Sequence, residues 1–254
     1  MLYPAELRAP TGDVPASCRR RQCLLAGLGL LLWPALPARA EEVAWAAVRP
    51  GWTIELTDGS VLRLAELAPE GSSEALERLL APGRLRFAEV GPVDRSGARP
   101  ALVWQGEASL QQRLVAAGRA RVLPTYDDDL AARLLLLEDA AREEERGLWG
   151  SGAFVVHPTA PTPAVDGFQV LRGAVVSASR TDRFLYLNFG ERYRESVSVR
   201  IRPRDGRSWG LTDRLHDFVG RVVEVRGFAF EDGGPMLELD HPAQLRVVDA
   251  RPAP

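Results

Sequence analysis

Apolar and polar residues alternate along five short segments of the first half of the chain. This period-2 pattern is typical of strands with one face buried. We expect strands at residues 52–56, 61–67, 85–90, 101–105 and 120–123. The first two are separated by Thr57-Asp58-Gly59-Ser60, and an Asp-Gly pair between apolar runs favours a β-hairpin.

Three other segments of the same region show helical spacing. A short helix should begin at Ser72-Ser73-Glu74 and end before Gly83, and a second should span residues 108–117. The third, at 127–146, repeats apolar residues on one face and carries three aspartates at its N-terminus, where the helix dipole favours negative charge. Five strands interrupted by a helix favour an OB-type barrel, here with three helices.

The second half of the chain is dominated by strand-like alternation. We expect strands at residues 170–176, 184–189, 196–201, 221–228 and 236–239, with a short helix at 211–218. The fold class predicted for the whole chain is therefore mainly β with helices (β+α): one OB-fold barrel followed by a second small OB-like β-barrel.

Composition marks the boundaries between these regions. Three prolines between His157 and Pro163 favour an extended spacer, so we place a linker at 155–165 between domains at 41–154 and 166–249, and a disordered tail at 250–254.

Residues 1–40 have the pattern of a signal peptide, in which Arg19-Arg20-Arg21 precede an apolar run and Ala38-Arg39-Ala40 ends it. That run, of about ten residues, is shorter than the about 20 needed to span a bilayer. The segment Arg20 to Leu24 resembles a twin-arginine export signal, with the Sec route as the alternative. We expect a periplasmic or secreted protein without a transmembrane segment in the mature chain.

Charge and cysteine content narrow the chemistry. Both cysteines, Cys18 and Cys23, lie in the predicted signal, so the mature chain would have neither disulfides nor thiols. All 32 basic residues are arginine, which coding bias explains and selection for phosphate contacts could also explain. The three histidines are scattered without metal-ligand spacing.

The stretch from Glu107 to Trp149 combines a helix, a short strand and a long helix that ends at Gly147-Leu148-Trp149. This order resembles the C-terminal half of the staphylococcal-nuclease-like (thermonuclease) family, and the resemblance extends over nearly all of 43–154. It implies an OB-fold barrel that cleaves phosphodiesters. In such enzymes carboxylates hold calcium, two arginines neutralise the transition state and a glutamate positions the attacking water.

The family's motifs are only partly present. The first metal motif, Asp-Gly-Asp-Thr, corresponds to Pro50-Gly51-Trp52-Thr53, which has no carboxylate. The second, Arg-Leu-x-Gly-Ile-Asp-x-Pro-Glu, corresponds to the segment from Arg63 to Glu70; it lacks the aspartate and is one residue shorter. Glu66 is a possible substitute ligand.

The third motif, Asp-Arg-Tyr-Gly-Arg, corresponds to the segment from Asp94 to Arg99, with its second arginine displaced by one position. The remnant catalytic candidates implied by the resemblance are Arg63, Glu70 and Arg99. An alternative for Arg63 and Glu70 is an ion pair with each other. We expect no metal and no cofactor, and calcium only if the site is active after all.

Nucleic-acid binding without cleavage is a second possibility. The first region, with 13 arginines and 19 acidic residues over 41–165, has a net charge of −6 and would repel a polyanion. In the second region arginines alternate with aromatic residues, as stacking on bases requires. The candidates are Arg200, Arg202, Tyr186 and Trp209. The alternative is a solvated strand edge that discourages aggregation.

The sequence therefore predicts an exported thermonuclease-like protein with an eroded nuclease site, which acts as a binding or scaffold module. Its expected partner is single-stranded nucleic acid or an envelope protein. The alternative is an active metal-dependent nuclease that cleaves DNA or RNA.

Overall fold

A computed structural model describes residues 41–160, 166–192 and 194–248. The predicted signal peptide, the end of the predicted linker and the predicted tail lie outside these ranges. The described residues belong to one compact unit. Within them, no helix combines the length and the apolar character needed to cross a membrane.

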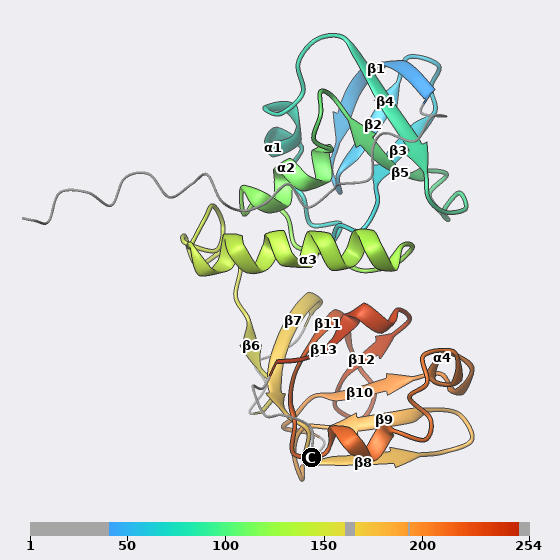
Figure 1. The fold of residues 1–254 in the computed structure, drawn as a ribbon, viewed down its shortest axis with the longest axis vertical. Coiled ribbons are helices and arrows are strands. Elements are labelled where there is room, and N and C mark those ends of the chain that lie inside the picture. The colour runs from blue at the N-terminus through green and yellow to red at the C-terminus, as the bar shows by residue number, and fades with distance from the viewer. Residues whose placement is uncertain (1–40, 161–165, 193, 249–254) are drawn as a thin grey trace, which may run out of the picture. The chain divides into compact units, whose positions relative to one another are not determined.

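The first module is a closed barrel of five strands in the order β1-β2-β3-β5-β4, with β3 and β5 parallel (Figure 1). Its strands are β1 (Glu41–Arg49), β2 (Thr53–Leu56), β3 (Val61–Leu64), β4 (Arg84–Glu89) and β5 (Arg99–Trp104). Its helices are α1 (Ser73–Glu77), α2 (Leu110–Ala116) and α3 (Asp128–Glu143). The predicted barrel with three helices is confirmed.

One strand was not predicted, and one predicted strand was wrong. The barrel begins with β1, whose side chains are exposed or half-buried along its length and so do not alternate in the manner of a strand. Residues 120–123 form no strand; only Val122 makes an isolated bridge, to Leu67.

Local sequence signals position the helices of the barrel. At the start of α2, the Ser109 hydroxyl accepts from the Gln112 amide at 3.2 Å, and the Gln112 side chain accepts from the Ser109 amide at 2.7 Å. This reciprocal arrangement satisfies two of the amides that a helix start leaves unpaired. At the start of α3, the Asp127 carboxylate accepts from the Leu130 amide at 2.9 Å.

The second module is an eight-stranded sheet in the order β6-β7-β11-β12-β10-β9-β8, with β13 paired to β11. The strands are β6 (His157–Pro158), β7 (Gly167–Ala174), β8 (Ser177–Arg180), β9 (Leu185–Asn188), β10 (Ser198–Ile201), β11 (Val222–Glu231), β12 (Pro235–Leu239) and β13 (Leu245–Val247). The sheet curls into a barrel-like module, as the predicted fold class requires, although its strand order has two free ends, β6 and β8.

Short helical segments complete the second module: α4 (Pro203–Ser208), η1 (Leu215–Phe218) and η2 (Pro242–Gln244). The helix predicted at 211–218 is thus a single 3-10 turn at its end. β6 lies in the predicted linker, where His157 pairs with Leu171 of β7. The start of that linker is therefore part of the second sheet.

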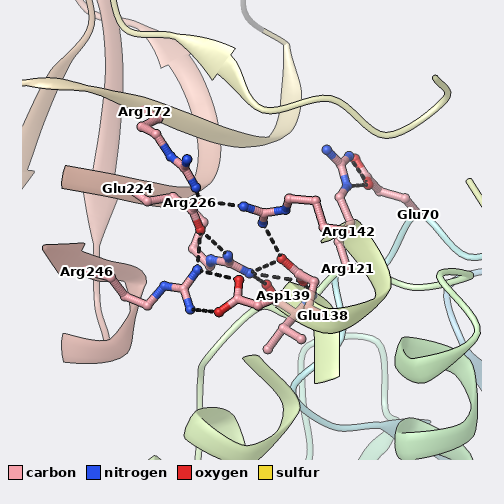
Figure 2. A network of polar contacts seen from close by, with 10 residues as sticks. Glu70, Arg121, Glu138, Asp139, Arg142, Arg172, Glu224, Arg226 and Arg246 are labelled. Carbon is pink, nitrogen blue, oxygen red and sulfur yellow. Dashed lines mark hydrogen bonds and ion pairs between the residues drawn. The ribbon is translucent and has the colours of Figure 1, made fainter. Parts of the chain in front are cut away.

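A network of buried charged side chains joins the two modules (Figure 2). At its centre is Arg226 of β11, whose side chain is 1% exposed. Arg226 donates to Glu138 of α3 at 3.0 Å and to Glu224, its neighbour on the same face of β11, at 2.6 Å. Both glutamate side chains are fully buried. Removing an ionised side chain from water is costly unless it is paired, so each carboxylate depends on the guanidinium groups around it.

Three further arginines surround Glu224. Arg142 of α3 donates to it at 2.7 Å, Arg172 of β7 at 2.8 Å and Arg246 of β13 at 2.7 Å. Burial acts to raise the pKa of Glu224, but the hydrogen bond from Arg142 and the positive charge of Arg226 outweigh it and hold that pKa well below its usual range. Glu224 is therefore ionised at neutral pH.

A second set of contacts joins the modules beside this network. The Arg121 guanidinium lies between the rings of Phe154 and Phe168, 4.9 Å from each centroid, and donates to the Phe168 carbonyl at 3.1 Å. The Gln244 side chain donates to the Pro124 carbonyl at 2.9 Å. The two modules are thus linked by charge, by ring stacking and by hydrogen bonds to the backbone.

Candidate functional site

An indole ring fills the place of the family's first metal motif. Trp52 adopts a left-handed backbone conformation, with φ of 60°, and is 3% exposed. Its Nε1 donates to the Ala68 carbonyl at 2.8 Å. The ring packs against Gly71 so closely that a Cβ on that glycine would lie 2.0 Å from it. A hydrophobic group thus occupies a position where the motif pattern has oxygen ligands.

Glu66 holds the loop between β3 and α1 against the start of α3. Its carboxylate accepts from the backbone amides of Thr125 at 2.8 Å, Tyr126 at 2.7 Å and Asp127 at 3.2 Å. Its φ is 62°, which explains why the motif pattern has glycine at this position. Burial raises the pKa of Glu66 to about 7, although the three amides oppose that rise. Both carboxylate oxygens are used, so Glu66 serves as a structural link and does not replace the missing metal ligand.

Arg63, on β3, forms an ion pair with Asp94. The Asp94 carboxylate also accepts from the amide and the hydroxyl of Ser96, both at 2.6 Å, and from the Ala98 amide at 3.1 Å. Burial acts to raise the pKa of Asp94, but these hydrogen bonds and the charge of Arg63 lower it. Arg63 therefore faces a partner that is ionised at neutral pH.

Arg99, at the start of β5, lies against the Phe87 ring at 5.1 Å and donates to Glu89 and to the Ser60 hydroxyl, both at 2.9 Å. Glu70 forms an ion pair with Arg121 (Figure 2). Each remnant candidate thus has its own partner, and the pairing of Arg63 with Glu70 that we considered as an alternative does not form. Glu70 and Arg63 also border different cavities, of about 410 Å³ and about 180 Å³ respectively.

The donor groups at this cleft do not fit calcium, which prefers several carboxylate or carbonyl oxygens. Trp52 and Ala68 offer no side-chain oxygen, Glu66 is used by three amides and Glu70 is neutralised by Arg121. Throughout the ranges that the structure describes, no three His, Cys, Asp or Glu side chains are grouped to hold a metal ion.

The second-module candidates lie around Arg200 on β10. Its guanidinium donates to Glu238 at 2.8 Å and to Asp232 at 2.7 Å, and it lies between the rings of Phe184 and Phe230, at 4.5 and 4.7 Å. Its side chain is only 18% exposed. Two carboxylates therefore neutralise this arginine, and two rings already cover its faces.

The other three candidates are also engaged. Arg202 forms an ion pair with Glu238 at 2.6 Å, and its side chain is 59% exposed. Tyr186 lies opposite Arg200 in the pairing of β9 with β10. Trp209 packs against the hydrophobic core of the second module. The structure brings Arg200, Arg202 and Tyr186 together, while Trp209 contributes to the core.

Sequence reasoning did not find the charged network between the modules. A signal was present, since Glu224 and Arg226 interrupt the apolar residues of β11 at alternate positions and therefore lie on one face. Their partners, Glu138 and Arg142, are spaced one helical turn apart on α3. The sequence does not reveal that these two faces meet.

A closed five-stranded barrel with three helices is consistent with a nuclease-like OB fold. Residues 69–151 match the family model described as Staphylococcal nuclease homologue, so this part of the chain is similar to that family. The match begins after Trp52 and Arg63, and so excludes the positions where the metal motif is missing. A search of curated proteins found no match.

Proposed function

We propose that this chain is an exported nuclease homologue that does not cleave nucleic acid and acts as a binding module. The observation that carries the proposal is the buried Trp52 indole, which hydrogen-bonds to Ala68 where the family pattern has metal-binding groups. Metal-dependent hydrolysis needs an ion that activates water and neutralises charge in the transition state. Glu70 and the two remnant arginines do not replace it, because each is held in a separate ion pair.

Plasmid cleavage in the presence of calcium tests the proposal directly. We expect the chain from residue 41 onward to cut supercoiled DNA no faster than buffer, and Glu70→Gln to give the same rate. Calcium-dependent cutting that Glu70→Gln abolishes would establish the enzyme and overturn the proposal.

The second sheet is a poor candidate for a nucleic-acid site, because Glu238 and Asp232 neutralise Arg200 and Glu238 also pairs with Arg202. Binding to a polyanion depends on uncompensated positive charge. We therefore expect a fluorescent single-stranded oligonucleotide to show no salt-sensitive binding. Binding that weakens in the Arg200→Ala, Arg202→Ala double variant would restore nucleic acid as the partner.

The proposed compartment rests on residues 1–40, whose pattern is that of a signal peptide. Expression of the full chain in a bacterium, followed by fractionation and N-terminal sequencing, should find the protein outside the cytoplasm with Glu41 as its first residue. An uncleaved cytoplasmic product would contradict export.

A further inference from the structure

A cavity of about 410 Å³ lies on the side of the first module where α1, the α2–α3 connection and residues 148–154 meet. Much of its lining is apolar, and the largest apolar groups are Trp52, Leu79, Leu148 and Phe154. Sites for small molecules are typically concave cavities of roughly 300–1,000 Å³, mostly apolar with a few fixed polar groups. This cavity has that size and composition.

Five charged side chains border the cavity: Glu70, Glu74, Arg78, Arg119 and Arg121. Four of them form two ion pairs, Arg121 with Glu70 and Arg78 with Glu74. Arg119 is exposed and forms no ion pair with any residue that the structure describes. The cavity therefore carries one uncompensated positive charge beside an apolar surface.

The polar wall of the cavity is preorganised. The Arg121 side chain is 10% exposed, because the Phe154 and Phe168 rings cover it and Glu70 holds its guanidinium. The Glu70 side chain, at 34% exposed, is turned to this same guanidinium (Figure 2). A ligand would meet a wall whose side chains are already fixed, and binding to fixed groups costs less conformational entropy.

We propose that this cavity binds an apolar molecule that ends in a single carboxylate. The apolar body would lie along Trp52, Leu79 and Phe154, and the carboxylate would pair with Arg119, whose planar guanidinium suits bidentate contacts with a carboxylate. The single unpaired cation that the described residues place at the cavity, Arg119, matches a ligand with a single carboxylate. A second negative charge would find no other unpaired cation among the described lining residues, because Arg121 and Arg78 are paired with Glu70 and Glu74.

The proposal names the ligand class for the binding role proposed above. The chemistry is shared by two sources, a free aliphatic acid and the C-terminal carboxylate of a peptide that ends in an apolar residue. Plasmid cleavage would contradict the loss of catalysis and leave this cavity unaffected, whereas failure to bind a carboxylate would contradict only the present inference.

Isothermal titration of the chain from residue 41 with decanoate, below its micelle-forming concentration, tests the charge. Decanoate should bind, and decanol should bind at least tenfold more weakly. Arg119→Gln should weaken decanoate binding at least tenfold and leave decanol unchanged. The matched control is Arg95→Gln, which removes an exposed arginine of the same module that does not line the cavity and should leave both affinities unchanged.

A second variant tests the apolar body. Leu79→Trp narrows the cavity and should abolish binding of decanoate and decanol alike, while far-ultraviolet circular dichroism confirms that the variant is folded. No decanoate binding by the unmodified chain, or equal binding by the Arg119→Gln and Arg95→Gln variants, would overturn the proposal.

A pair of peptides with an apolar last residue, one with a free C-terminus and one amidated, identifies the source. Tighter binding of the free-carboxylate peptide than of decanoate would support a protein C-terminus as the ligand. Binding of decanoate alone would support a small acid. Measurable and equal binding of the two peptides would show that the carboxylate is not recognised and would contradict the proposal.

Discussion

Two buried regions are packed in opposite ways: the cleft around Trp52, and the charged network around Arg226 that joins the two modules, here called the joint. At the cleft, an indole packs on Gly71 where the family's pattern would place ionised groups. At the joint, two fully buried glutamates and a buried arginine lie between α3 and β11, where an apolar contact would be the simpler solution. Burying a charged side chain without a stabilising partner is costly. The buried charges of the joint therefore require the surfaces of α3 and β11 to stay in contact.

This difference shows that similarity of fold to a nuclease family and the presence of that family's catalytic groups are separate questions. Residues 69–151 match the model of the staphylococcal nuclease homologue family. Arg63, Glu70 and Arg99, the three remnant candidates, are each held in a local ion pair, whereas Arg142 and Arg226 connect α3 to the second module. Four measurements test this contrast.

The largest effect should come from removing the centre of the joint. Arg226→Met leaves Glu138 and Glu224 buried with fewer partners, and removing one member of a buried ion pair costs about 3–5 kcal/mol. Urea unfolding measures the loss. The control is Arg192→Met, because Arg192 and its partner Glu195 are 78% and 63% exposed; it should cost no more than about 1 kcal/mol. Equal losses in the two variants would show that the joint does not support the fold.

Stability should next depend on pH through Glu66. Its folded pKa of about 7 lies above its ordinary value of 4.5, so the folded state binds the proton more tightly than the unfolded state. The protonated Glu66 carboxyl contributes fully to the free energy of unfolding below pH 4.5, and this contribution is lost as pH rises through 7. Relative to Glu66→Gln, the unmodified chain should lose about 3 kcal/mol across that range.

Unfolding free energies of both proteins at several pH values give this difference directly. Glu107→Gln, which alters an exposed glutamate of the same module, controls for the loss of one negative charge. A difference between the unmodified chain and Glu66→Gln that stays constant from pH 4.5 to 7 would contradict the raised pKa.

A smaller effect is expected at the indole itself. Gly71→Ala would place a methyl group within the Trp52 ring, and forcing extra atoms into a packed site costs about 1–3 kcal/mol. Gly59→Ala is the control for a glycine in open space, although its positive φ carries a cost of its own. Thermal unfolding compares the stability of the two variants. An unchanged stability of Gly71→Ala would mean that the Trp52 indole is not held in the cleft.

The smallest effect should come from the exposed edge of the second sheet. Arg202→Gln removes a pair with Glu238 in which the arginine side chain is 59% exposed, so it should cost no more than about 1 kcal/mol. Urea unfolding measures it beside Arg226→Met. A loss as large as that of Arg226→Met would place a second essential charge cluster on this face.

Much of the fold could be predicted from periodicity. The helices and most strands have clear apolar spacing, and Ser109 and Asp127 mark the starts of α2 and α3. β1 could not be found, because the half-buried residues of Glu41–Arg49 do not alternate. The site was less predictable: motif positions identified Arg63 and Glu70, but their partners, Asp94 and Arg121, are set by how distant segments come together.

The bond between Arg226 and Glu138 crosses 88 positions of the chain, from the last strand-rich segment back to the longest helix. Separating the two halves would break this bond, together with the pairs of Arg142 with Glu224 and of Arg246 with Asp139. Cutting the gene at the proline-rich stretch should yield two insoluble or molten products rather than two working pieces. We therefore expect the halves to depend on each other as the subunits of an obligate heterodimer do.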